Sequence, residues 1–139
     1  MYLDTSVLAA LYIPEAQSGA VARAVAGAAP SISALVEVEF AAVVARRIRE
    51  RTLTAADGAK VLRMFDAHVA ERRYRHLPVG AQTFAEAGRL LRLGAAPLSA
   101  LDALHLAIVV SGREPLCTAD RQLGHAATRA GVKLRLIRG

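Results

Sequence analysis

Short apolar segments alternate with longer helical stretches along the whole chain, and this alternation restricts the possible folds more than any other feature. Strands of a few residues are expected at five places, namely residues 1–4, 31–32, 74–78, 115–118 and 132–137. Helices are expected between and after them, at approximately 6–12, 18–28, 33–51, 54–71, 81–93, 97–112 and 120–130. Such an alternation is typical of an α/β domain with a parallel sheet. The sequence therefore predicts one domain over residues 1–139, with a short-stranded parallel sheet flanked by helices.

The composition indicates a well-packed domain with a basic surface. Hydrophobic residues make up 54% of the 139 residues, enough for a sizeable core without disulfides or structural metals. The formal net charge is +6, and arginine supplies 16 of the 18 basic residues. The planar guanidinium group binds phosphate well, so nucleic acid fits this surface as a partner. A solvated basic surface, or one covered by an acidic protein, would give the same composition.

Neither cysteine usage nor the N-terminal segment indicates export. The single cysteine, Cys117, excludes an internal disulfide, and its apolar surroundings favour a packed core thiol over a nucleophile. The first residues lack the basic region and cleavage site of a signal peptide. No uncharged apolar run approaches the length of a membrane span. These features lead us to expect a cytoplasmic protein with no membrane partner.

Four of the twelve acidic residues stand where a carboxylate needs a partner or a function. Asp4 and Asp120 follow two expected strands, and Glu39 and Asp102 lie early in two apolar helices. Three of the four have an alternative structural role. Asp4 and Asp120 could each cap the following helix, and Asp102 fits a capping box with Ser99. Glu39 has no such alternative, because it lies two turns inside its helix.

The expected positions of these acids favour a shared metal site. The carboxyl ends of parallel strands meet at one edge of the sheet, where ligands bind. Four carboxylates at that edge would repel one another unless a cation compensated their charge. Oxygen ligands without a supporting cysteine or histidine pattern select Mg²⁺ or Mn²⁺. Such ions bind phosphates and activate water for cleavage of phosphodiesters.

Four segments together resemble the PIN-domain family, and specifically the VapC-type ribonuclease toxins of toxin–antitoxin pairs. The segment "YLDTS" resembles the family's first strand and first acid, Asp4. The segments "ISALVEVEF", "LDALHLAIV" and "LCTADRQL" resemble those that carry the second, third and fourth acids. The second acid falls on Glu39 rather than Glu37. One departure is Gln122, which stands where many relatives carry a further acid. This difference concerns an auxiliary metal ligand and leaves the four acids unchanged. The resemblance covers essentially the whole chain and rests on the order and spacing of all four segments.

The resemblance implies a fold, an activity and partners. The fold would be a PIN-like three-layer α/β domain with a twisted parallel sheet of about five strands. The activity would be that of a Mg²⁺- or Mn²⁺-dependent endoribonuclease, inhibited by a VapB-like antitoxin and usually forming a homodimer. The family's metal ligands, held directly or through water, would be Asp4, Glu39, Asp102 and Asp120. The hydroxyl groups that orient the carboxylates or water would be those of Thr5, Ser6 and Thr118.

Two arginines are candidates for contacting RNA phosphates. Arg46 lies two turns after Glu39 on approximately the same helix face, and Arg121 is the neighbour of Asp120. The histidines show no ligand spacing with one another. His105 is expected to be a core histidine and not a general base.

Three other classes of protein fit the residues less well. A response-regulator receiver would need a pair of acids near the first strand and a suitably placed lysine. A haloacid-dehalogenase-like phosphatase would need an aspartate where Ser6 stands. A non-catalytic PIN-like domain that binds RNA or protein is the stronger alternative, but such a domain would be expected to have lost acids, and none is lost here.

Overall fold

The computed structural model describes residues 1–94 and 97–138, which form five strands and seven helices. The strands are β1 (Tyr2–Leu3), β2 (Ser31–Ser33), β3 (Arg75–Leu77), β4 (Leu116–Thr118) and β5 (Leu134–Leu136). The helices are α1 (Thr5–Tyr12), α2 (Ser18–Val25), α3 (Ala34–Arg49), α4 (Ala55–Ala70), α5 (Ala81–Leu93), α6 (Ala100–Gly112) and α7 (Arg121–Arg129). Every expected element is present, with ends that differ by a few residues. None of these helices combines the length and apolar character that crossing a membrane requires.

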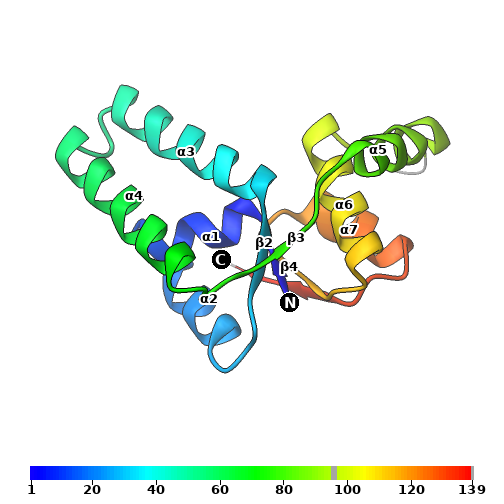
Figure 1. Cartoon of the computed structure of the whole chain (residues 1–139), viewed down its shortest axis with the longest axis horizontal. Helices are drawn as coiled ribbons and strands as arrows, with labels where there is room; N and C mark the ends of the chain where they lie inside the picture. The colour runs from blue at the N-terminus through cyan, green and yellow to red at the C-terminus, as the bar shows by residue number, and fades with distance from the viewer. Residues whose placement is uncertain (95–96, 139) are drawn as a thin grey trace.

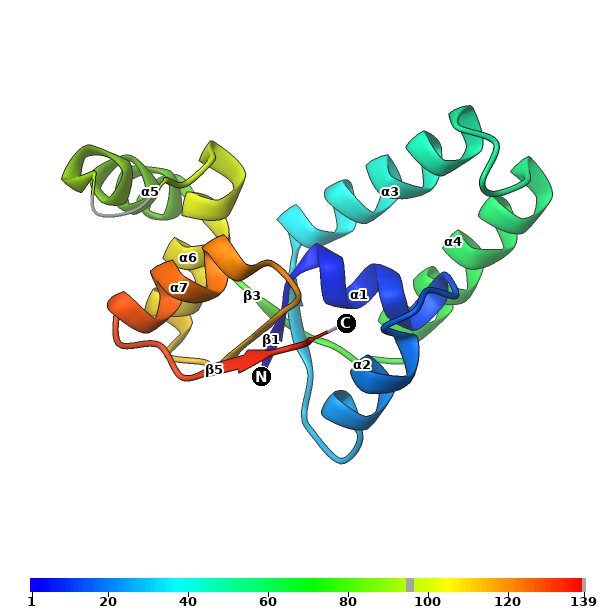
Figure 2. The same cartoon turned by 180° about the vertical axis from the view of Figure 1, so that it is seen from behind.

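The five strands form one parallel sheet in the order β3-β2-β1-β4-β5. The chain moves from β1 through β2 to β3 in one direction and then returns to β4 and β5 on the other side of β1. Because crossovers between parallel strands are right-handed, this reversal places the two sets of connecting helices on opposite faces. Helices α1 to α4 lie on one side of the sheet, and α5 to α7 lie on the other (Figures 1 and 2). The expected three-layer α/β architecture is confirmed.

The reversal of direction lies between the neighbouring strands β1 and β4. Helix α1 leaves the carboxyl end of β1 toward one face, and α7 leaves the carboxyl end of β4 toward the other. Such a switch point opens a crevice at the carboxyl edge of an α/β sheet, and ligands bind there. Asp4 follows β1 and Asp120 follows shortly after β4, so both stand at this position. Helix α6 returns the chain to the start of β4, so its first turn also faces the carboxyl edge.

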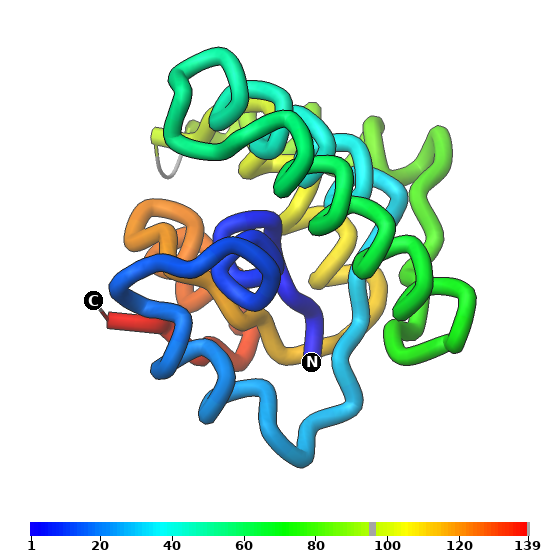
Figure 3. The backbone as a smooth tube through the Cα atoms, turned by 90° about the vertical axis from the view of Figure 1, so that its left-hand side faces the viewer, coloured from blue at the N-terminus to red at the C-terminus, as the bar shows by residue number. Residues whose placement is uncertain are grey.

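The core is formed by the central strands and the helix faces that cover them. Tyr2, Leu3, Leu116 and Cys117 are fully buried, as expected for the middle of a parallel sheet covered on both faces. Helices α3 and α4 pair side by side (Figure 3). Aromatic rings join the pair to α1, with Phe40 of α3 and Phe65 of α4 in edge contact at 5.1 Å between ring centroids.

The buried Cys117 should not react with thiol reagents while the protein is folded. Its side chain has no exposed surface, and burial raises the pKa of the thiol to about 11, so little thiolate is present at neutral pH. Because Cys117 is the only cysteine, the absorbance change with Ellman's reagent reports it alone. We expect no reaction in native buffer and a rate that rises in urea together with loss of helical circular dichroism. Rapid reaction before unfolding would contradict the buried position.

Candidate active site

Asp4 joins the end of β1 to the start of α1 and to the end of β4 through three hydrogen bonds. Its Oδ1 accepts the Val7 backbone N–H at 3.1 Å and the Ser6 hydroxyl at 2.6 Å, and its Oδ2 accepts the Thr118 hydroxyl at 2.5 Å. The residue is only 4% exposed. Burial raises the pKa of this carboxyl above its ordinary value, although the three hydrogen bonds act in the opposite direction. Asp4 is therefore a helix cap, and its Oδ2 still has a lone pair available for a further ligand.

Thr118 connects Asp4 to Asp120 across the switch point. The Thr118 hydroxyl oxygen donates to Asp4 and accepts the Asp120 backbone N–H at 2.9 Å. Asp120 caps α7, because its Oδ1 accepts the N–H groups of Gln122 at 2.7 Å and Leu123 at 3.1 Å. Its Oδ2 accepts no hydrogen bond from the described residues. One hydroxyl group thus holds the two strand-end acids near each other.

Ser6, in the first turn of α1, also links the end of β1 to the end of β4. Its hydroxyl donates to Asp4 and accepts the backbone N–H of Ala119 at 3.1 Å. The Ser6 and Thr118 hydroxyls therefore both donate to Asp4, and their role in a metal site stays a prediction.

Glu39 extends from α3 toward the first residue of α1 and toward α6. Its Oε1 accepts the Thr5 hydroxyl at 3.0 Å and lies 2.5 Å from Nε2 of His105. Burial acts to raise the pKa of Glu39, but the bonds from His105 and Thr5 outweigh it and lower the pKa overall. Glu39 is thus a carboxylate at neutral pH. Glu37 instead lies at the surface with its Oε1 3.0 Å from Nε2 of His76, so the two acids of this helix have separate environments.

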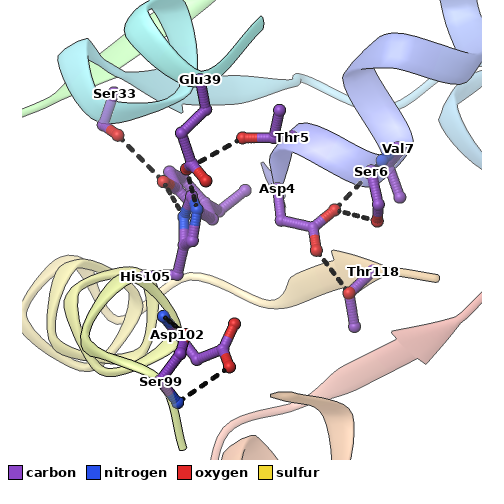
Figure 4. Close-up of polar contacts among 11 residues, drawn as sticks. Asp4, Thr5, Ser6, Val7, Ser33, Glu39, Ser99, Asp102, His105 and Thr118 are labelled. Atoms are coloured by element: carbon purple, nitrogen blue, oxygen red, sulfur yellow. Dashed lines mark hydrogen bonds and ion pairs between the residues drawn. The ribbon is translucent and has the colours of Figure 1, made fainter. Parts of the chain in front are cut away.

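Asp102 lies in the first turn of α6 and forms a reciprocal capping box with Ser99. The Asp102 N–H donates to the Ser99 hydroxyl, and the Ser99 N–H donates to Asp102 Oδ2, both at 3.1 Å. Its Oδ1 accepts no hydrogen bond from the described residues. Figure 4 shows Asp4, Glu39 and Asp102 around one region, with His105 between the last two.

These acids do not form a ready-made metal cage. Among the described residues, no three histidine, cysteine, aspartate or glutamate side chains already stand together as a ligand set. Carboxylates without a cation repel one another, and here each is held by donors from the protein instead. The donors nevertheless suit a hard cation. Glu39, Asp102 and Asp120 are partly exposed, and each keeps one oxygen without a hydrogen bond from the described part of the chain. An all-oxygen set of this kind fits Mg²⁺ or Mn²⁺.

The sequence reasoning placed His105 in the core but missed its link to Glu39. His105 is 4% exposed, as a core histidine would be, and it bonds Glu39 on one side and the Tyr2 hydroxyl on the other. Its spacing from Asp102, three residues along the same helix, was the available signal, because such residues share a helix face.

The two candidate RNA-contacting arginines lie on different helices, Arg46 on α3 and Arg121 on α7. Arg46 lines a hollow of about 320 Å³ together with Glu39, Thr5 and Ser6. Arg121 is exposed at the first residue of α7, beside Asp120. Arg47 lines the same hollow but pairs with Glu15, and an RNA contact by Arg46 stays a prediction.

Comparisons with known proteins give a family and a fold. The model of the family described as "PIN domain" matches residues 1–128. No curated protein sequence matches the chain. Among solved structures, VapBC2 from Rickettsia felis, bound to a DNA fragment from its promoter, is similar with a TM-score of 0.69 and 15% identity, covering 99% of this chain and 98% of that one. The Mycobacterium tuberculosis toxin VapC20, described as cleaving the sarcin–ricin loop, has a TM-score of 0.65 and 21% identity, covering 90% and 93%. FitAcB from Neisseria gonorrhoeae has a TM-score of 0.61 and 17% identity, covering 96% and 94%.

Proposed function

Because the chain belongs to the PIN domain family, we propose that it is a metal-dependent endoribonuclease and the toxin of a VapBC-type toxin–antitoxin pair. The observation that carries this proposal is that Asp4 and Asp120 stand at the switch point of the sheet, linked through Thr118, while Glu39 and Asp102 lie in helices that begin at the same edge. Three of these acids, Glu39, Asp102 and Asp120, each retain a carboxylate oxygen that the described part of the chain does not use.

Asp4, Glu39, Asp102 and Asp120 would hold the metal, directly or through water. A bound Mg²⁺ or Mn²⁺ would make water a stronger nucleophile at neutral pH and stabilise negative charge on the phosphate. The chain's own part is to hold the carboxylates in fixed directions. Thr118 and Ser6 do this for Asp4, and Thr5 does it for Glu39, through the hydrogen bonds described above.

The proposed partners are a VapB-like antitoxin and a second copy of the chain. The likeness in fold to VapBC2 and FitAcB supports a toxin–antitoxin pair. Exposed apolar side chains support a protein partner close to the acids, because Val38 and Leu101 are 69% and 46% exposed and precede Glu39 and Asp102 directly. We propose that both partners and the RNA are met in the cytoplasm.

A non-catalytic PIN-like domain that binds RNA or protein is the second candidate. The observation that favours it is the lack of a preformed ligand set among the described residues. Cleavage separates the two candidates. The purified protein should cleave RNA with Mg²⁺ or Mn²⁺ and should stop doing so with EDTA. Binding of RNA without cleavage at any concentration of either ion would favour the non-catalytic domain.

We expect Arg46→Ala to weaken RNA binding and to reduce its dependence on salt. A phosphate contact releases counterions, so losing one contact lowers the slope of log affinity against log salt by roughly one contact, about 0.7–0.9. The measurement is RNA titration at several salt concentrations, in EDTA to prevent cleavage. Arg129→Ala is the charge-matched control, because Arg129 lies in the last turn of α7, away from the carboxyl edge. Equal effects of both substitutions would remove Arg46 from the RNA path.

A further inference from the structure

A buried chain of hydrogen bonds runs from the sheet to Glu39. The Ser33 hydroxyl lies 2.9 Å from the Tyr2 hydroxyl, which lies 2.9 Å from Nδ1 of His105. Nε2 of His105 lies 2.5 Å from Glu39 Oε1. Ser33 and Tyr2 are fully buried and His105 is 4% exposed, so water does not compete for the bonds among these three residues, whereas Glu39 is partly exposed. Figure 4 labels Ser33, His105 and Glu39 of this run.

The tautomer of His105 gives this chain its direction. Glu39 is a carboxylate and can only accept, so the ring nitrogen that meets it, Nε2, carries the hydrogen. In a neutral imidazole Nδ1 then accepts, and the donor to it is the Tyr2 hydroxyl. The Tyr2 oxygen in turn accepts from Ser33. Each hydroxyl is used once as a donor, and every buried polar atom has a partner among the described residues.

We propose that His105, Tyr2 and Ser33 are positioning residues for the metal site, which hold Glu39 so that its second oxygen, Oε2, stays available to the cation. This inference rests on the proposed metal-dependent function. Oε1 receives both His105 and Thr5 and is thereby fixed, whereas Oε2 receives no donor from the described residues. The two donors reach Glu39 from different elements, α6 and α1, so they fix its direction as well as its charge.

Packing alone does not account for these three residues. A buried tyrosine, histidine and serine each carry a polar group whose burial is unfavourable unless it is bonded, and apolar side chains would fill the same space without that requirement. The chain also offers an internal comparison. The Tyr12 hydroxyl meets Nδ1 of His68 at 2.7 Å, in a similar tyrosine–histidine bond that leads to Tyr74 and to no acid.

Four variants test the proposal. His105→Leu removes the donor to Glu39, and His105→Gln restores a donor near the position of Nε2. Tyr2→Phe removes only the hydroxyl that orients the ring. Tyr12→Phe is the matched control, because it breaks the other tyrosine–histidine bond. Binding of Mn²⁺ is measured by electron paramagnetic resonance, which detects the free ion and needs no RNA cleavage.

Partners that orient a metal ligand typically contribute about 10–100-fold in metal affinity. We expect His105→Leu to weaken Mn²⁺ binding by about 10–100-fold, His105→Gln to recover most of that loss, and Tyr2→Phe to weaken binding by about 3–10-fold. Tyr12→Phe should bind as the wild type does. Wild-type affinity in both His105→Leu and Tyr2→Phe, or equal weakening by His105→Gln and His105→Leu, would overturn the proposal. If His105→Leu does not fold, the Mn²⁺ affinity of Tyr2→Phe alone tests the proposal.

Nitrogen-15 NMR of histidine in the metal-free protein tests the direction of the chain. We expect His105 to carry its hydrogen on Nε2, with the Nδ1 signal shifted by Tyr2→Phe and unchanged by Tyr12→Phe. A hydrogen on Nδ1 would overturn the proposed direction.

The positioning role and the proposed ribonuclease function can fail separately. If the variants change Mn²⁺ affinity as expected but the protein does not cleave RNA, the ribonuclease function is rejected and the positioning role is retained. If the protein cleaves RNA and the variants do not change Mn²⁺ affinity, the positioning role is rejected and the ribonuclease function is retained.

Discussion

Glu39→Gln should reduce RNA cleavage by at least about 100-fold, because loss of a proposed metal ligand should exceed the 10–100-fold effect typical of a residue that only orients one. The amide has nearly the same shape and can still accept from Thr5 and His105, so the packing of α3 should be kept. What it lacks is the negative charge that a hard cation requires. The measurement is the rate of cleavage of a labelled RNA with saturating Mn²⁺.

Glu37→Gln is the matched control for this experiment. It makes the same chemical change two residues away on the same helix, where Glu37 meets His76 at the surface. We expect it to cleave RNA at the wild-type rate.

A similar pair of variants exists for the third acid, Asp102. Asp102→Asn should abolish cleavage, whereas Asp57→Asn, at the same position of α4 behind its cap Thr54, should not. Equal loss in a control and its partner would reject the assignment of the acids.

The second large effect concerns stability and depends on which residue replaces Asp4. In EDTA, Asp4→Asn should melt at the same temperature as the wild type or higher, whereas Asp4→Ala should lose about 1–3 kcal/mol. Asparagine is as good a helix cap as aspartate and can still accept from Val7 and Ser6. It also removes a buried charge. Its NH₂ group takes the place of the oxygen that accepts from Thr118 and can donate to the Thr118 oxygen instead. Alanine removes the cap and leaves the Val7 N–H and the Ser6 and Thr118 hydroxyls without their acceptor. Both variants should be inactive toward RNA.

Thermal denaturation by circular dichroism separates the two roles of Asp4. If Asp4→Asn unfolds the protein, the carboxylate is needed for the fold and its metal role loses support.

The pH dependence of the free energy of unfolding provides a second check. Burial raises the pKa of Asp4 in the folded state, so the folded protein binds this proton more tightly than the unfolded chain. The contribution of Asp4 to stability is therefore full below its ordinary pKa and is lost as pH rises through the raised one. Any advantage of Asp4→Asn at pH 7 should shrink as the pH is lowered.

Much of the fold could be predicted because its local signals are strong. The residues that start helices, such as Ser99 before α6 and Asp120 before α7, are capping residues and act as caps in the structure. The glycine at position 94 ends α5 in the left-handed conformation, at a φ of 61°, as expected for a glycine after a helix. These are interactions between residues a few positions apart, which a sequence records directly.

The position of the four acids at one edge of the sheet was also predictable in outline. Parallel strands bring their carboxyl ends together, and Asp4 and Asp120 follow such ends. The sequence could not decide between capping and metal binding for Asp4, Asp102 and Asp120. In the structure Asp4 and Asp120 are caps and Asp102 completes the capping box of Ser99, and a carboxylate has a second oxygen that these roles need not use. Capping and metal binding are therefore compatible roles, and the Mn²⁺-binding and cleavage experiments test metal binding.

By itself the sequence determined the class of fold and the approximate extent of the elements, and it predicts the set of acids, because these depend on spacing along the chain. Only the tertiary structure decided the order of the strands, with β1 beside β4, and hence the single hydroxyl of Thr118 that joins Asp4 to Asp120. It also decided that His105 meets Glu39, 66 residues away in sequence, and that Tyr2 lies behind it. The physical reason is that these bonds form between groups that only packing brings together. Their burial makes each donor and acceptor find a partner, and no local pattern specifies which one.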